Sequence, residues 1–120
     1  MVAPNPRAQI AIDTALAQTG KPYQYAASGP DSFDCSGLTM YAWAAAGVSL
    51  PHSSAAQYAM LPHVSQDQLL PGDLVFYGGS IHHVGMFIGN GQYVHAPHTG
   101  TVVQISSIYR SDYHGAARVP

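Results

Sequence analysis

The spacing of apolar residues changes once along this 120-residue chain, and that change constrains the fold more than any other feature. In the first half, apolar positions recur with helical spacing and predict helices over residues 6–19 and 36–46. From residue 73 onward, strand-like runs alternate with turns rich in Gly, Asn and Pro. Helices followed by consecutive antiparallel strands are typical of an α+β fold and argue against a parallel α/β sheet.

Turn and capping residues define the ends of these elements. Asn5 suits the N-cap of the first helix and Pro6 its first helical position, while Gly20-Lys21-Pro22 ends the helix. Residues 23–34 form a turn-rich loop, and Gly47 is expected to cap the second helix. The predicted strands cover residues 73–77, 83–88, 92–96, 101–105 and 116–119.

The hairpin around Asn90-Gly91 has two possible registers. A two-residue loop would pair Gly89 with Gln92 and would mix aliphatic and aromatic side chains on each face. A three-residue loop, with Gly91 left-handed, pairs Ile88 with Gln92 and separates the two kinds of side chain. The hydrophobic pattern favours the second register.

This register sorts the hairpin side chains onto an aliphatic face and a polar-aromatic face. The residues of the second face are His83, Gly85, Phe87, Tyr93 and His95. His83 and His95 are then diagonal neighbours, about 7–8 Å apart at the backbone. His82 and His98 fall on the opposite face and are predicted to be non-catalytic, and His63 and His114 are expected in exposed loops.

Cys35 is the single cysteine of the chain, and it stands where the loop becomes a helix. Backbone N–H groups and the dipole at a helix start stabilise a thiolate, so its pKa is expected below the free value of about 8.5. A lone Cys can also be a small buried hydrophobe, but its polar neighbours Asp34 and Ser36 weigh against that interpretation. His83 is then the candidate base, and His95 would orient its ring.

The composition excludes several classes of function. Only 8% of residues are charged, the net charge is −2 and the four Lys and Arg residues are dispersed, so neither nucleic acid nor an anionic membrane is an expected partner. No apolar run approaches the ~20 residues that span a bilayer. With one cysteine, no Glu and no H-E-x-x-H motif, the seven histidines predict no metal site, and no cofactor is expected.

The start of the chain contains neither the basic nor the apolar segment of a signal peptide. The chain is therefore expected to be cytosolic or a catalytic fragment of a longer secreted protein. No repeat or linker interrupts it, which favours a single domain over residues 1–120 with an irregular tail at residues 1–6.

Several blocks of sequence together resemble the NlpC-type family of papain-like cysteine endopeptidases, which cut bacterial peptidoglycan stem peptides. These blocks are Lys21-Pro22-Tyr23, Phe33-Asp34-Cys35-Ser36-Gly37-Leu38, Leu50-Pro51-His52-Ser53-Ser54 with Gln57, Pro71-Gly72-Asp73-Leu74-Val75-Phe76-Tyr77, His83-Val84-Gly85 and Tyr93-Val94-His95-Ala96. The similarity extends from about Arg7 to Val119. It implies a papain-like fold in which the nucleophile begins a helix packed on a central antiparallel sheet, in a secreted or cell-wall-associated protein. Independently of the resemblance, the chain is expected to be a monomer.

By this resemblance Cys35 is the nucleophile, His83 the general base and His95 the polar orienting residue. The implied reaction is cleavage of the amide between D-glutamate (or D-isoglutamine) and the diamino acid, meso-diaminopimelate, through an acyl-enzyme. An acyl transferase or amidase on the same scaffold and a non-catalytic wall-binding module remain alternatives. The complete Cys-His-His trio argues against the binding module.

The resemblance also implies substrate-binding roles. Tyr23 would add its hydroxyl to the Cys35 N–H in binding the oxyanion, although it could equally be an ordinary half-buried aromatic residue. Asp34 and Ser36 would hold polar groups of the stem peptide, and Asp34 could equally be a helix N-cap. Ser54, or its neighbour Ser53, would line the groove, and Ser54 could equally cap a short helix.

Two positions depart from the family pattern. Ala26-Ala27 replaces the usual Gly-Gly, which puts the geometry of the loop beside the groove in question. His52 stands where the family often has Arg, so the cleft lacks a permanent cation at that position.

Overall fold

The three helices of the structure carry caps that the sequence partly predicts. The structure is a computed structural model that describes residues 3–120, and part of the tail predicted at residues 1–6 therefore lies outside the described residues. Helix α1 (Pro6–Ala17) begins inside that predicted tail, and the Asn5 side chain accepts the Ala8 N–H at 2.9 Å. It ends two residues before the predicted end, residue 19, with Gln18 as its C-cap.

Helix α2 (Cys35–Ala45) starts one residue earlier than predicted, so Cys35 is its first residue and Asp34 its N-cap. Its C-cap is Ala46 rather than the predicted Gly47. Helix α3 (Ser54–Met60) corresponds to the short helix that was one of the alternatives at Ser54. Its N-cap is Ser53, whose Oγ accepts the Ala56 N–H at 3.2 Å, so Ser54 does not cap the helix.

Six antiparallel strands form one sheet in the order β1-β6-β2-β3-β4-β5, which confirms the predicted α+β class. The predicted strand at 101–105 lies at 104–107, the one at 116–119 begins at residue 113, and the short β1 and 3₁₀ helix η1 (Gln66–Gln68) were not predicted. The strands are β1 (His63–Val64), β2 (Leu74–Tyr77), β3 (His83–Gly89), β4 (Gln92–His95), β5 (Gln104–Ser107) and β6 (Tyr113–Ala117).

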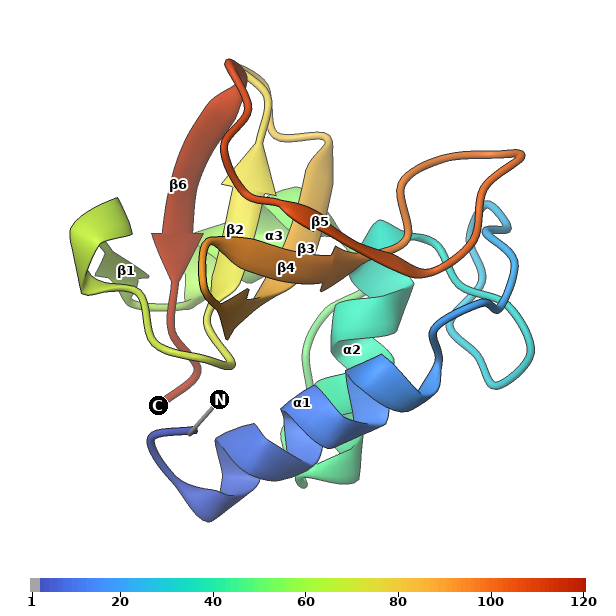
Figure 1. Ribbon diagram of the computed structural model, residues 1–120, viewed down its shortest axis with the longest axis horizontal. Coiled ribbons are helices and arrows are strands. Elements are labelled where there is room, and N and C mark those ends of the chain that lie inside the picture. Colours follow the sequence, from blue (N-terminus) through green and yellow to red (C-terminus); the bar gives the residue numbers. More distant parts are fainter. Residues whose placement is uncertain (1–2) are drawn as a thin grey trace.

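Figure 1 shows α1 and α2 side by side against one side of this sheet. The core between them combines the buried faces of both helices with the aliphatic side chains of β2, β3 and β4. On α3, the ring of Tyr58 packs edge-on against Phe76 of β2, 5.0 Å between centroids. The opposite side of the sheet carries a second buried cluster that includes Tyr77, Phe87 and Tyr93. Within residues 3–120 no helix has the length and apolar character needed to cross a bilayer.

The β3–β4 hairpin combines the two registers considered above. Its loop has two residues, Asn90 and Gly91, with φ of 53° and 67°, and Gly89 pairs with Gln92. The predicted pairing of Ile88 with Gln92 is therefore wrong. However, the register shifts at Ile88, as in a β-bulge, and further along Met86 pairs with Val94 and Phe87 with Tyr93. This shift gives the predicted separation of the two faces.

Candidate active site

Cys35 is half-buried at the first position of α2. The side chain of Asp34 holds this helix start, because Oδ1 accepts the Gly37 N–H at 2.7 Å and Oδ2 accepts the Ala26 N–H at 3.0 Å. The preceding loop packs so closely that a Cβ on Gly37 would overlap the carbonyl oxygen of Ala27. The helix start and the loop thus position Cys35 together.

The Ala26-Ala27 departure is accommodated by backbone conformation. Ala26 adopts φ of +64°, a left-handed conformation that glycine adopts more easily. Ala27 accepts the Asp34 N–H at 2.8 Å through its carbonyl. The loop therefore keeps its hydrogen bonds to the nucleophile segment without the usual glycines.

The two histidines predicted to share a face do meet. His83 begins β3 and His95 ends β4, and both are buried, each 4% exposed. Nε2 of His83 lies 2.8 Å from Nδ1 of His95. On its far side, Nε2 of His95 lies 2.8 Å from the Ser106 hydroxyl. Ser106 was missed because the predicted strand stopped at residue 105, one residue short of it.

Aromatic packing fixes the plane of the His95 ring. Tyr93 stacks on His95 with 4.1 Å between centroids and an interplanar angle of 24°. Gly85 makes this stack possible, because a Cβ there would overlap the Tyr93 ring and lie 2.9 Å from the His95 Cβ. The glycine of the His83-Val84-Gly85 block is thus required by space rather than by backbone conformation.

The thiol of Cys35 lies against the start of β3. Sγ is 3.9 Å from the carbonyl oxygen of His82, and the Val84 N–H lowers the pKa of the thiol. The two backbone groups that interact with the thiol thus belong to the residues on either side of His83 in sequence. Since Nε2 of His83 is bonded to His95, its Nδ1 is the ring nitrogen left for the thiol. Among the described residues that nitrogen makes no hydrogen bond.

The expected low pKa of Cys35 is wrong. Burial, followed by the negative charge of Asp34, raises the pKa of the thiol above its ordinary value. The N–H groups of Val84, Ser36 and Cys35 lower it, as expected at a helix start, but they do not outweigh the first two effects.

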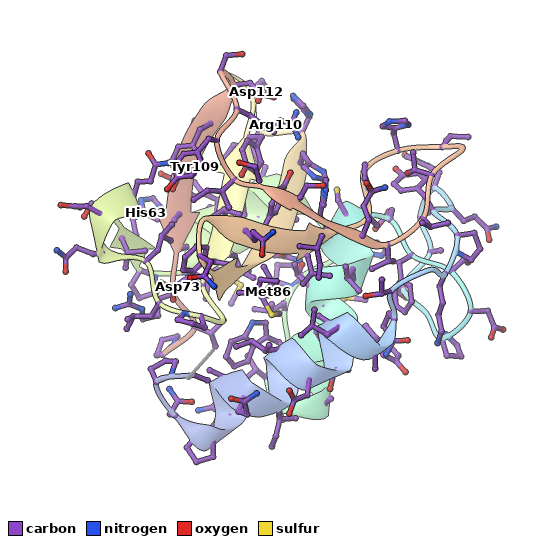
Figure 2. All side chains as sticks on the ribbon, viewed as in Figure 1. His63, Asp73, Met86, Tyr109, Arg110 and Asp112 are labelled. Carbon is purple, nitrogen blue, oxygen red and sulfur yellow. The ribbon has the colours of Figure 1, made fainter. Side chains whose placement is uncertain are left out.

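Burial also keeps both histidines neutral. It lowers the pKa of His83 to about 3, with further lowering by His95 and Arg110, and lowers the pKa of His95 to about 4, with Arg110 contributing. Arg110 and Asp112 lie together in the segment before β6 (Figure 2), and Arg110 also donates to the Tyr93 hydroxyl at 3.3 Å. At neutral pH the Cys35 thiol is therefore neutral, and so are both imidazole rings.

The three remaining residues that were predicted to bind substrate are Tyr23, Ser36 and Ser54, and they differ in their surroundings. Burial, then the charges of Cys35 and Asp34, raises the pKa of Tyr23, which is half-buried. Ser36 is buried, and its carbonyl accepts the Gln57 side chain at 3.1 Å. Ser54 is half-buried at the first position of α3. Their binding roles stay predictions.

Five histidines stand outside the trio, of which His52 pairs with Asp34 and the other four are exposed. His82 and His98 lie outside the strands rather than on the aliphatic face, and both are exposed. His63 and His114 are exposed but belong to strands β1 and β6 rather than to loops. Among residues 3–120, no three His, Cys, Asp or Glu side chains are grouped to hold a metal ion.

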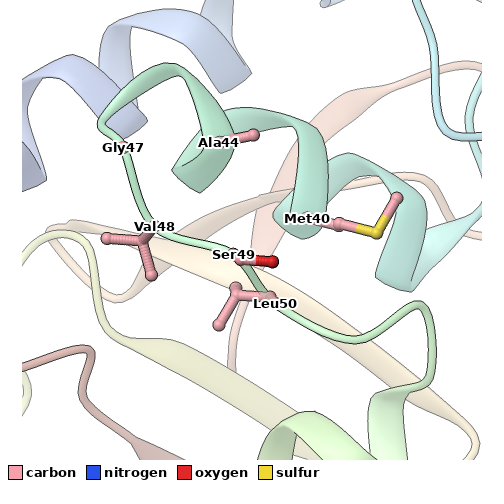
Figure 3. A pocket seen from close by; sticks show the side chains of 6 residues that line it. All are labelled: Met40, Ala44, Gly47, Val48, Ser49 and Leu50. Carbon is pink, nitrogen blue, oxygen red and sulfur yellow. The ribbon is translucent and has the colours of Figure 1, made fainter.

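A hollow of about 480 Å³ opens at the other end of α2 (Figure 3). It contains none of the site residues and is lined by Met40, Ala44, Gly47, Val48, Ser49 and Leu50.

Comparisons with known proteins identify one family. The family model of the NlpC/P60 family matches residues 20–118. "Probable endopeptidase p60" of Listeria monocytogenes is 46% identical over 104 residues, which are 85% of this chain and 21% of the relative. "Peptidoglycan endopeptidase RipA" of Mycolicibacterium smegmatis is 36% identical, over 86% of this chain and 24% of the relative. The chain thus spans about a fifth of the length of these curated relatives.

Solved structures show the same fold. An NlpC/P60 family protein from Bacillus cereus superposes with a TM-score of 0.90 at 34% identity, covering 97% of this chain and 41% of that one. RipD of Mycobacterium tuberculosis, described as a non-catalytic NlpC/p60 domain protein adapted to peptidoglycan binding, superposes at 0.87 with 31% identity, covering 97% and 99%. From the family match and these identities, the chain belongs to the NlpC/P60 family.

Proposed function

We propose that this chain is a cysteine endopeptidase that hydrolyses peptidoglycan stem peptides between D-glutamate, or D-isoglutamine, and the diamino acid meso-diaminopimelate. The observation that carries the proposal is the imidazole pair, with Nε2 of His83 2.8 Å from Nδ1 of His95, beside a thiol at a helix start. A hydrogen bond of this kind leaves Nδ1 of His83 as the site for the thiol proton. The specific bond comes from the resemblance to the family.

In the first half of the reaction, Nδ1 of His83 takes the proton of Cys35 as sulfur attacks the amide carbonyl. The tetrahedral oxyanion forms beside the Cys35 N–H and the Tyr23 hydroxyl. Collapse breaks the C–N bond, and His83 returns the proton to the departing amine of the diamino acid. The product is a thioester between Cys35 and the D-glutamyl carbonyl.

In the second half, His83 accepts a proton from water, whose oxygen attacks the thioester. The C–S bond breaks, sulfur regains the proton from His83, and a carboxylic acid is released, which loses its own proton to water. Because thiol and imidazole are both neutral at rest, charge separates only when the proton moves. The thiolate formed in that step stabilises the imidazolium that faces it, although burial disfavours each charge alone.

The family supports a place of action at the cell wall. RipA is named a peptidoglycan endopeptidase, and the RipD domain is described as peptidoglycan-binding. Stem peptides are thus the proposed partner, bound by a chain that acts as a monomer. The RipD likeness also makes a wall-binding module the second candidate, but this chain carries Cys35, His83 and His95, a trio that wall binding alone does not require.

Mass spectrometry after incubation with a defined muropeptide that contains meso-diaminopimelate tests the proposal. We expect two fragments, of which one carries a new free amine on the diamino acid, and no fragments with Cys35→Ala. Equal digestion by Cys35→Ala would overturn the thiol mechanism. A product with an added amine acceptor would identify an acyl transferase, and retention on peptidoglycan without any cleavage would identify a binding module.

A further inference from the structure

Ser106 lies at the outer end of the imidazole pair. It belongs to β5, is half-buried, and its Oγ is 2.8 Å from Nε2 of His95. The three side chains form one series of hydrogen bonds from β3 through β4 to β5. Ser106 is therefore the last partner of the two rings.

The reaction requires a particular direction of donation along this series. His83 can accept the thiol proton only if its Nδ1 is unprotonated, so in the neutral ring the proton is on Nε2. Nε2–H of His83 then donates to Nδ1 of His95, and the proton of neutral His95 must be on its own Nε2. That N–H needs an acceptor, and the Ser106 hydroxyl oxygen is in place to accept it.

Packing alone does not distinguish the two orientations of the His95 ring. Tyr93 stacks on its face, and a half-turn about the Cβ–Cγ bond would leave that stacking intact. The half-turn would exchange ring nitrogens for carbons and break the hydrogen bonds to both His83 and Ser106. These two bonds therefore hold the ring orientation.

We propose that Ser106 is a positioning residue that keeps His95 in the Nε2–H tautomer and thereby directs the lone pair of His83 Nδ1 toward Cys35. This role rests on the proposed function, because it matters only if His83 acts as a base. Without the hydroxyl, His95 also populates the Nδ1–H tautomer, which donates to His83 and places the His83 proton on Nδ1. His83 in that form cannot accept from the thiol.

Three variants test the role by kinetics. Ser106→Ala is expected to lower kcat about tenfold, as for one lost hydrogen bond, with KM unchanged. Ser106→Thr retains the hydroxyl on a β-branched residue suited to a strand and is expected to restore kcat to within about twofold. Ser107→Ala is the matched control, since Ser107 is exposed and its Oγ accepts the Tyr109 N–H at 3.1 Å instead.

Nitrogen-15 NMR of the His95 ring gives a readout that needs no substrate. We expect wild-type His95 protonated on Nε2 and not on Nδ1, and a mixture of tautomers in Ser106→Ala. An Nδ1–H tautomer in the wild type, or wild-type kcat in Ser106→Ala, would overturn the proposal. If the wild type cleaves no muropeptide, the proposed function fails while the tautomer still decides the role of Ser106. If Ser106→Ala does not fold, Ser106→Thr and the wild-type spectrum decide it.

Discussion

Oδ1 of Asp34 lies 2.7 Å from Nε2 of His52, so the residue before the nucleophile is paired with an imidazole ring. The same carboxylate caps α2 through Gly37 and anchors the loop through Ala26. Its charge also raises the pKa of Cys35. Asp34 therefore serves both the fold and the electrostatics of the thiol, and two substitutions separate these effects.

Asp34→Asn is expected to lower the pKa of Cys35, because it removes the charge and keeps an oxygen that can accept the Gly37 N–H. The pH profile of iodoacetamide alkylation measures this change, and its midpoint should move to lower pH. Asp34→Ala should move it in the same direction and also cost about 1–2 kcal/mol in urea unfolding, since the cap is lost. Asp31→Asn, at an exposed position of the same loop, is the control. An unmoved midpoint in Asp34→Asn would show that another group raises the pKa.

The imidazole pair should make the fold sensitive to acid. The pKa of His83 is lowered to about 3 and that of His95 to about 4, whereas both are near 6.5 in the unfolded chain. Below pH ~6.5 the unfolded chain thus binds protons that the native chain does not, so stability falls as the pH falls toward 4. Each histidine contributes at most about 1.4 kcal/mol per pH unit.

Urea unfolding at a series of pH values between 7.5 and 4.5, on the order of one measurement per half unit, checks this slope. His95→Asn retains a hydrogen-bonding side chain and removes one titrating ring, so its free energy of unfolding should depend less steeply on pH than that of the wild type. Identical slopes in the two proteins would mean that other groups cause the acid sensitivity.

Arg110 should be one source of the low histidine pKa values. Its guanidinium lies 4.6 Å over the Tyr77 ring, and its charge lowers the pKa of both His83 and His95. Arg110→Gln removes that charge and retains a donor for Tyr93. We expect both pKa values to rise, measured from the pH dependence of the histidine C–H signals in NMR spectra. Arg7→Gln is the control, because Arg7 is exposed and its nearest hydrogen-bond partner is the Pro120 carbonyl. Unchanged values in Arg110→Gln would contradict the assignment.

The sequence pattern could predict the faces of the hairpin, because only one arrangement gathers the aliphatic residues on one face, and His83 and His95 then share the other. It could not predict the register shift at Ile88, since a two-residue loop with a bulge and a three-residue loop give the same alternation further along. Asn90 and Gly91 both favour positive φ, and this signal correctly indicates the shorter loop.

Two features of the site are not predicted correctly from the sequence, the pKa of Cys35 and the role of Ser106, because both depend on tertiary packing. The helix start predicts a low pKa for Cys35, but neither burial nor the charge of Asp34 can be weighed without the packing of loop and helix. Recognising Ser106 as a partner of His95 requires the alignment of β5 with β4, in which Tyr93 pairs with Ser106. The ends of short strands are poorly defined by sequence patterns. Local capping, as at Asn5, needed no such tertiary information.

Gly85→Ala should displace the residues of the candidate active site, because Gly85 lies on β3 directly against Tyr93 and His95. A Cβ at this position would overlap the Tyr93 ring and lie 2.9 Å from the His95 Cβ, and none of these atoms is the free end of a flexible chain. We expect a loss of about 1–3 kcal/mol in urea unfolding, as for other overpacked cores. The displaced His95 should also lower kcat by on the order of a hundredfold. Gly79→Ala is the matched control, because Gly79 is exposed and a Cβ there meets no atom within 4 Å. Wild-type kcat and stability in Gly85→Ala would mean that the Tyr93–His95 stack can shift without loss, and that the stack does not position the imidazole pair.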